Sequence, residues 1–254
     1  MTDIAPLTPD LSDRVILVTG AGRGIGAAVA QALAAHKATV ILLGRRVHDL
    51  EAIYDAIVAA GHPMPAIAPV NLEALRWEEA QTLIDRIGSE FGRLDGLLHN
   101  AAYLGGLTPL IHFPLEEWYR TLQVNLNAPF VLTQSCLPLL KASSDASILF
   151  TTDAAGRKGK AYFGAYGVSK FAIQGLMETL AEETQTNTSI RVNCIDPGTV
   201  RTDLFSRIYP GRGDELLPSP QDLVWPYLYL LGPEGRGLSG QTFKAQGDGP
   251  WRHA

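Results

Sequence analysis

Residues 15–26 read VILVTGAGRGIG and decide the fold class. The first five are apolar or β-branched, as in a buried strand, and the glycines that follow let the backbone turn sharply before a helix begins near Ala27. Such a helix would direct its free N–H groups and positive dipole end at an anion such as a pyrophosphate. The spacing Gly20-x3-Gly24-x-Gly26 differs from the common GxGxxG, but it lies between a strand and a helix, as that motif requires. The stretch predicts a dinucleotide-binding α/β fold.

The rest of the chain repeats this alternation of strand and helix. Apolar runs predict strands at 15–19, 39–43, 66–70, 94–99, 147–152, 190–195 and, at an edge, 241–245. Helical patterns cover 27–36, 50–60, 77–91, 115–140 and 162–183, and we expect Pro129 and Pro138 to kink or divide the fourth of these. The alternation predicts a doubly wound, Rossmann-type parallel sheet of about seven strands with helices on both faces. Residues 1–254 are expected to form a single dinucleotide-binding domain, with 203–221 as a flap over the substrate.

Composition narrows the function class. The 254 residues are 46% apolar and 19% charged, which fits one globular core. A net charge of -5 without a long basic run gives no reason to expect nucleic acid, and no apolar run reaches the roughly 18 residues that span a bilayer. Cys136 and Cys194 lie outside any CxxC or Cys/His cluster, so we expect buried, reduced thiols and no metal. The N-terminus lacks the pattern of a signal peptide, which favours a cytoplasmic location.

The end of the second strand indicates which dinucleotide is bound. An NAD site usually places an acid there for the ribose 2′-hydroxyl. This chain has Gly44-Arg45-Arg46 instead, and Arg23 lies inside the glycine loop. These arginines could clamp a 2′-phosphate through charge-assisted hydrogen bonds, or they could be solvated charges at a helix entry. Because the acid is also missing, the pattern favours NADP(H).

Tyr166 and Lys170 form a candidate acid–base pair. They stand at i and i+4, so on a helix they share one face. A lysine ammonium beside the phenol favours the phenolate, so we expect the pKa of Tyr166 to lie below its usual value of about 10. Tyr166 would then exchange a proton near neutral pH.

These motifs, together with His99-Asn100-Ala101-Ala102, Asn125 in QVNL, and Pro197-Gly198 with Thr202, resemble the short-chain dehydrogenase/reductase family in its compact single-domain form. The resemblance extends from Val15 to about Gly249. The segments TQSCLPLL, GAYGVSKFA and RVNCIDPG are most similar to a YciK-like branch of bacterial oxidoreductases.

The resemblance implies a role for each matching residue. Tyr166 would exchange the proton of a carbonyl or alcohol substrate, Lys170 would hold the nicotinamide ribose, and Asn125 would bind a water in a proton relay. It also implies a homodimer or homotetramer joined through 115–140 and 162–183. The implied contacts to NADP(H) are Gly20, Arg23, Gly24, Ile25, Gly26, Arg45, Asn71, Leu72, Asn100, Ala101, Tyr166, Lys170, Pro197, Gly198, Val200 and Thr202.

One position departs from the family pattern. The family has a serine 13 residues before the tyrosine, whose hydroxyl binds the substrate oxygen, and here that position is Asp153. Thr152 offers a hydroxyl one residue earlier, but neighbouring strand residues point to opposite faces, so it could replace the serine only if the strand has already ended or bulged there. Asp153 could be protonated and donate a hydrogen bond, could be ionised and oppose a phenolate at Tyr166, or could point away. We expect the first or the third, and we include Asp153 among the catalytic candidates.

Three functions follow from this pattern. The first is an NADP(H)-dependent oxidoreductase that acts on a small carbonyl or alcohol substrate. The second is an NADP(H)-binding regulatory or scaffold protein with little turnover, which Asp153 favours and the set of Tyr166, Lys170 and Asn125 opposes. The third is a different enzyme on the same fold, such as an epimerase or dehydratase.

Overall fold

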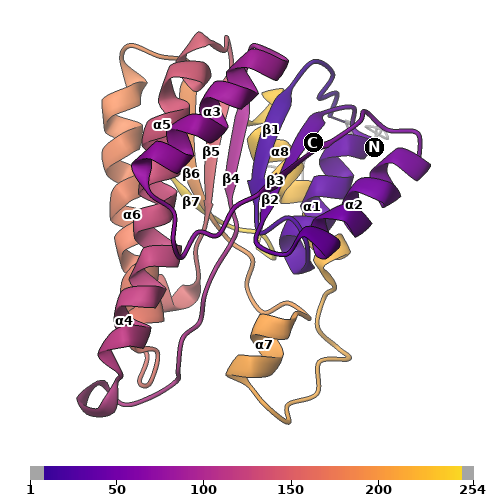
Figure 1. Cartoon of the computed structure of the whole chain (residues 1–254). Helices are drawn as coiled ribbons and strands as arrows, with labels where there is room; N and C mark the ends of the chain where they lie inside the picture. Colours follow the sequence, from indigo (N-terminus) through magenta and orange to yellow (C-terminus); the bar gives the residue numbers. More distant parts are fainter. Residues whose placement is uncertain (1–8, 248–254) are drawn as a thin grey trace, which may run out of the picture.

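The computed structural model describes residues 9–247 and contains one seven-stranded parallel sheet in the order β3-β2-β1-β4-β5-β6-β7 (Figure 1). The doubly wound Rossmann-type sheet predicted from the sequence is therefore confirmed. The central strands are apolar along their whole length because both faces of the sheet are covered. The strands are β1 (Val15–Thr19), β2 (Thr39–Gly44), β3 (Ala66–Pro69), β4 (Gly96–His99), β5 (Ala146–Thr151), β6 (Ile190–Asp196) and β7 (Thr242–Lys244).

Helices cover both faces of the sheet (Figure 1). One face carries α3 (Trp77–Phe91), α5 (Ala128–Ala142) and α6 (Gly164–Gln185), and the other carries α1 (Gly24–Ala35), α2 (Val47–Ala59) and α8 (Val224–Leu231). Side chains of β1 alternate between the two layers, as a strand requires: Leu17 enters the first core, whereas Ile16 and Val18 enter the second. Short 3-10 turns are η1 (Leu110–His112), η3 (Ala154–Gly156), η4 (Pro220–Leu223) and η5 (Pro233–Gly235).

The predicted long helix at 115–140 has a different form. It consists of α4 (Leu115–Leu122), a π-turn η2 (Gln123–Asn127) and α5, so the irregularity precedes Pro129, and Pro138 lies inside α5 without ending it. The Ala128 N–H bonds to the Gln123 carbonyl five residues earlier, which defines the π-turn. Pro129 starts α5, where its missing N–H costs little.

The predicted flap contains a helix that the sequence pattern did not indicate. Residues 203–221 begin with α7 (Asp203–Ile208), which lies beyond the ends of the strands and apart from the main helical layers (Figure 1). Thr202 caps α7, because its hydroxyl accepts a hydrogen bond from the Phe205 N–H at 3.3 Å.

A buried charge cluster surrounds Asp145 near the start of β5. Its carboxylate lies 3.1 Å from Arg14, 3.2 Å from Arg191 and 3.2 Å from Arg236, and its side chain is 8% exposed. Burial alone would raise the pKa of Asp145, but Arg191 and Arg14 hold it below its ordinary value. This cluster ties β5, β6 and the chain before β1 together at the end of the sheet away from the glycine loop.

Candidate active site

A cavity of about 1150 Å³ lies at the carboxyl ends of the strands. Strand order reverses between β1 and β4, and ligands of open α/β sheets bind at such a point. The cavity brings together residues that are far apart in the sequence. Its wall includes Gly20, Arg23, Gly24, Ile25, Arg45, Asn71, Leu72, Asn100, Ala101, Asp153, Tyr166, Lys170, Pro197, Gly198, Val200 and Thr202, all predicted site residues.

The glycine loop leaves room that side chains would fill. Gly20 and Gly24 have φ angles of 69° and 57°, in the left-handed region that favours glycine. A Cβ on Gly20 would lie 3.0 Å from the Ala101 Cα. The loop and the N-terminus of α1 thus form a cradle that fits a dinucleotide pyrophosphate.

Gly26 was predicted to contact the cofactor, and its surroundings indicate a role in packing. Gly26 is absent from the residues that line the cavity. A Cβ at Gly26 would lie 2.3 Å from the Gly20 carbonyl oxygen and 2.7 Å from Asn100 Nδ2. Its role is to allow close packing of α1 against the loop.

Thr19 joins the two strands that flank the crevice, which the sequence analysis did not anticipate. Its hydroxyl accepts hydrogen bonds from the N–H groups of Asn100 at 3.0 Å and Ala101 at 3.1 Å. Thr19 is buried. A hydroxyl at the end of an otherwise apolar strand was the available signal, since a buried polar group needs partners.

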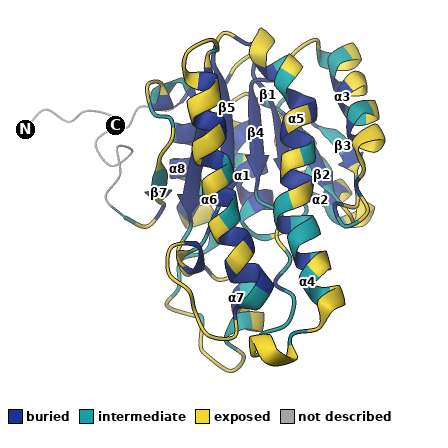
Figure 2. Cartoon of the chain, turned by 90° about the vertical axis from the view of Figure 1, so that its left-hand side faces the viewer, coloured by how far each residue is buried: buried dark blue, intermediate teal, exposed yellow. Residues whose placement is uncertain are grey.

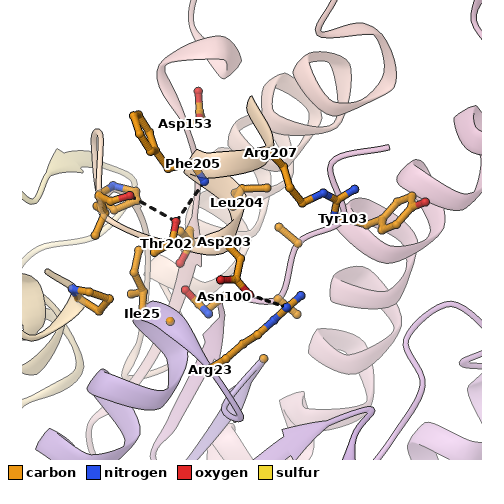
Figure 3. A pocket seen from close by; sticks show the side chains of 18 of the residues that line it. Arg23, Ile25, Asn100, Tyr103, Asp153, Thr202, Asp203, Leu204, Phe205 and Arg207 are labelled. Atoms are coloured by element: carbon orange, nitrogen blue, oxygen red, sulfur yellow. Dashed lines mark hydrogen bonds and ion pairs between the residues drawn. The ribbon is translucent and has the colours of Figure 1, made fainter. Parts of the chain in front are cut away.

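Three arginines form a positive rim on the cavity. Arg23 pairs with Asp203 at 2.9 Å, as Figure 3 shows, Arg45 pairs with Glu73 at 3.8 Å, and Arg46 pairs with Asp49. All three guanidinium side chains are more than half exposed. Exposed ion pairs contribute at most about 1 kcal/mol, so a bound phosphate can replace these carboxylates.

Tyr166 and Asp153 face each other in the cavity. The Tyr166 hydroxyl donates to Asp153 Oδ2 at 3.2 Å, and Asp153 Oδ1 accepts the Ala155 N–H at 2.7 Å. The interpretation in which Asp153 points away is therefore wrong. β5 ends at Thr151, so Thr152 lies beyond the strand, where it lines the cavity; it is buried, and its hydroxyl lies 3.5 Å from the Lys170 carbonyl oxygen.

The pKa of Tyr166 moves in the direction opposite to the prediction. Burial raises it well above 10, and the carboxylates of Asp153 and Asp196 raise it further. The Lys170 ammonium donates to the Thr151 carbonyl at 2.7 Å and lies 5.5 Å from the centre of the Tyr166 ring. Burial also lowers the pKa of Lys170. In this state Tyr166 is a neutral phenol hydrogen-bonded to Asp153.

Asn125 lies in the π-turn and is buried. Its Oδ1 accepts the Tyr103 N–H at 2.7 Å, while its Nδ2 donates to the Tyr103 carbonyl at 2.9 Å and to Ser169 Oγ at 3.0 Å. Asn125 does not line the cavity. Its side chain fixes the loop after β4 against α6, the helix that carries Tyr166 and Lys170.

Asp196 is a second buried carboxylate that sequence reasoning missed. It ends β6, accepts the Gly198 N–H at 2.9 Å and forms an ion pair with Arg157. These bonds shape the Pro197-Gly198 turn, in which Gly198 has a φ of 69°. The available signal was an acid within the apolar run that precedes Pro197.

Apolar side chains line the cavity beside Tyr166. Phe163, Leu204 and Ile208 pack in a small cluster with Tyr166. Leu204 and Ile208 come from α7, and Figure 3 labels Leu204. Lys160 donates to the Tyr209 hydroxyl at 2.6 Å and lies 4.4 Å from the centre of the Phe163 ring. This wall fits an apolar substrate body.

Residues 9–247 contain neither a metal-binding cluster nor a membrane-spanning helix. No group of three or more His, Cys, Asp and Glu side chains in this range is placed to hold a metal ion. No helix in the same range has the length and apolar character to cross a membrane. Cys136 and Cys194 are buried and unpaired.

Comparison with known proteins agrees with this geometry. The family model for short chain dehydrogenases matches residues 14–213. The uncharacterized oxidoreductase YciK of Escherichia coli K12 is 42% identical over 236 residues, 93% of each chain. A short chain dehydrogenase structure from Salmonella enterica serovar Typhi superimposes with a TM-score of 0.93 at 42% identity, covering 95% of this chain and 99% of the other. A structure from Escherichia coli CFT073 in complex with NADPH gives 0.92 at 42% identity, covering 95% and 100%. The chain therefore belongs to the short chain dehydrogenase family.

Proposed function

We propose that the protein is an NADP(H)-dependent oxidoreductase that transfers a hydride between nicotinamide and a small apolar carbonyl or alcohol substrate. The observation that carries this proposal is the neutral Tyr166 phenol in the cavity wall, next to buried Lys170. When bound, NADPH supplies the hydride. The residues of this chain bind the cofactor, orient the substrate and supply the proton.

The choice of NADP(H) rests on the arginine rim. A 2′-phosphate could bind the guanidinium groups of Arg23, Arg45 and Arg46. The end of β2 also lacks the acidic residue that accepts a hydrogen bond from the ribose 2′-hydroxyl in NAD sites. The 42% identical structure from Escherichia coli CFT073 that holds NADPH supports the same choice.

Proton transfer is assigned to Tyr166. Its hydroxyl would turn from Asp153 to the substrate oxygen and donate the proton as the oxyanion develops. Lys170 would hold the ribose, and Asn125 would bind a water in the relay. Pro129 has no N–H, so it makes no helical hydrogen bond to the backbone carbonyl of Asn125, four residues before it. That carbonyl would then be available to the water of the relay. Residues 203–221, with α7, would cover the substrate and exclude water.

The protonation state of Asp153 would determine how well the site stabilises the oxygen of a carbonyl substrate. A protonated Asp153 would donate a second hydrogen bond to the substrate oxygen, whereas an ionised one would oppose the oxyanion. We expect Asp153→Ser, which restores the family hydroxyl, to raise ketone turnover by orders of magnitude. If Asp153→Asn and Asp153→Ala leave turnover unchanged, Asp153 has no role in catalysis.

The regulatory or scaffold alternative is favoured by one observation, the carboxylate that faces Tyr166. NADPH consumption against a panel of aldehydes, ketones and diketones separates the two functions. Consumption supports the oxidoreductase. Tight NADPH binding with no consumption across the panel supports the alternative, and it would also fit an epimerase, which oxidises no net NADPH.

We also propose a homodimer or homotetramer that forms through α4, α5 and α6. Large apolar side chains are exposed on these helices, namely Leu115, Phe130, Val168 and Phe171. The three helices face the viewer in Figure 2. Light scattering should give a multiple of 27.4 kDa, and the double variant Phe130→Glu/Phe171→Glu should give the monomer. A wild-type mass of 27.4 kDa would contradict this assembly.

A further inference from the structure

The Asp153 carboxylate faces the cavity and has no ion-pair partner among residues 9–247, although the Lys170 ammonium interacts with it electrostatically. Among residues 9–247, the other four acids named around the cavity have arginine partners: Asp196 pairs with Arg157, Asp203 with Arg23, Asp49 with Arg46 and Glu73 with Arg45. Within the same range, no lysine, arginine or histidine forms an ion pair with Asp153. The Lys170 ammonium donates to the Thr151 carbonyl at 2.7 Å instead.

Both Asp153 oxygens act as acceptors. Oδ1 accepts the Ala155 N–H at 2.7 Å, and Oδ2 accepts the Tyr166 hydroxyl at 3.2 Å. An ionised Asp153 in this arrangement is an acceptor only and has no proton to donate. A ketone oxygen has only lone pairs to offer, so it gains nothing from such a group, and the negative charge disfavours an oxyanion at that point.

The opposite holds for a protonated imine. Its nitrogen carries a positive charge and an N–H that donates, so it complements a carboxylate in a partly buried site through a charge-assisted hydrogen bond. The apolar wall of Phe163, Leu204 and Ile208 would hold the hydrocarbon part of the same molecule. The cavity thus offers an acceptor for the C=N end and an apolar surface for the rest.

We propose that this site reduces the C=N bond of a protonated, largely apolar imine, with Asp153 as the residue that binds the iminium N–H. This inference rests on the proposed hydride transfer and extends its substrates from C=O to C=N compounds. Hydride from NADPH forms the new C–H bond, the C=N π pair becomes the nitrogen lone pair, and the products are a neutral amine and NADP+. No proton from Tyr166 is consumed in this step.

Binding of a stable iminium mimic tests Asp153 apart from turnover. Calorimetry on the NADPH-saturated protein compares benzamidine, a planar cation with N–H donors, with neutral benzamide of the same shape. We expect benzamidine to bind at least tenfold more tightly than benzamide. Asp153→Asn and Asp153→Ser should lose this advantage, whereas Asp85→Asn, the same change at an exposed position on α3, should keep it. Equal binding of the two probes to wild type, or an advantage that survives in Asp153→Asn, would overturn the inference.

Turnover then separates the inference from the proposed function. NADPH consumption is measured with 3,4-dihydroisoquinoline and with 1-tetralone, a ketone of similar size. We expect wild type to favour the imine, and Asp153→Ser to shift the ratio of kcat/KM toward the ketone by at least tenfold. Reduction of the ketone but not the imine by wild type overturns the inference and leaves the proposed function standing. If no form reduces either compound, the proposed function fails and the inference fails with it.

Discussion

The Tyr166 hydroxyl donates a hydrogen bond of 3.2 Å to Asp153 Oδ2, so the proposed proton donor is held by a carboxylate when no substrate is bound. In the family pattern a serine hydroxyl stands at this position. The change from hydroxyl to carboxylate replaces a donor to the substrate with an acceptor, and it places negative charge beside the phenol. Both consequences can be measured.

The first consequence is the ionisation of Tyr166. Burial and the Asp153 carboxylate raise its pKa well above 10, so Asp153→Ser should lower that pKa. Tyrosinate absorbance, taken as the difference from Tyr166→Phe in each background, follows this one residue. Wild type should show no Tyr166 ionisation up to pH 10, and an unchanged onset in Asp153→Ser would show that the carboxylate does not control the phenol.

The arginine rim should control the choice between NADPH and NADH. Arg45→Ala removes a guanidinium from the cavity wall, so the Kd for NADPH should rise by at least about tenfold while the Kd for NADH stays the same. Fluorescence titration of both cofactors measures the ratio, and exposed Arg86→Ala on α3 is the control. Equal losses for both cofactors would place Arg45 away from the 2′-phosphate.

Acid should destabilise the protein through His99. His99 is buried, stacks on Phe150 and bonds to Thr133 at 2.8 Å, and burial lowers its pKa to about 3. The unfolded chain binds this proton below about pH 6.5, so the stability that neutral His99 contributes is present above that pH and is lost as pH falls toward 3.

Urea unfolding at pH 7 and pH 4 measures this effect. Between pH 7 and pH 4, the free energy of unfolding should fall less in His99→Asn than in wild type. The difference between the two proteins should be at most about 1.4 kcal/mol for each pH unit below 6.5. His48→Asn, at an exposed position on α2, is the matched control and should follow wild type. Equal acid sensitivity of His99→Asn and wild type would contradict the assignment.

Asp145 should be the most sensitive charged position for stability. Asp145→Ala leaves buried Arg14 and Arg191 without their carboxylate, so the free energy of unfolding should fall by about 3–5 kcal/mol. Asp10→Ala removes an exposed pair with Lys37 and should lower the free energy of unfolding much less than Asp145→Ala does. Urea denaturation compares them, and similar losses would show that the cluster around Asp145 contributes no more than a surface ion pair.

The sequence predicted the sheet well because its signal is local. The run at 15–19 matches β1 residue for residue, and 147–152 differs from β5 by one residue at each end. Strands covered on both faces are continuous apolar runs, so their residues can be identified from the sequence alone. The glycine loop and the spacing of Tyr166 and Lys170 are local signals of the same kind.

The missing features depend on contacts between distant segments. The π-turn at 123–127 and the Arg157–Asp196 pair depend on tertiary packing, which the spacing of residues in the sequence does not predict. The direction of the Tyr166 pKa was wrong for the same reason. The nearby lysine was visible in the sequence, whereas the burial that outweighs it was not.

The proton-donor role of Tyr166 is the central claim, and NADPH consumption by wild type beside Tyr166→Phe tests it most directly. Removing this one hydroxyl should reduce carbonyl reduction by at least about 10²-fold while NADPH binding is retained. Tyr162→Phe, the same change at a 58% exposed tyrosine just before α6, should keep wild-type turnover. Tyr166→Phe that consumes NADPH as fast as wild type with a carbonyl substrate would contradict the account.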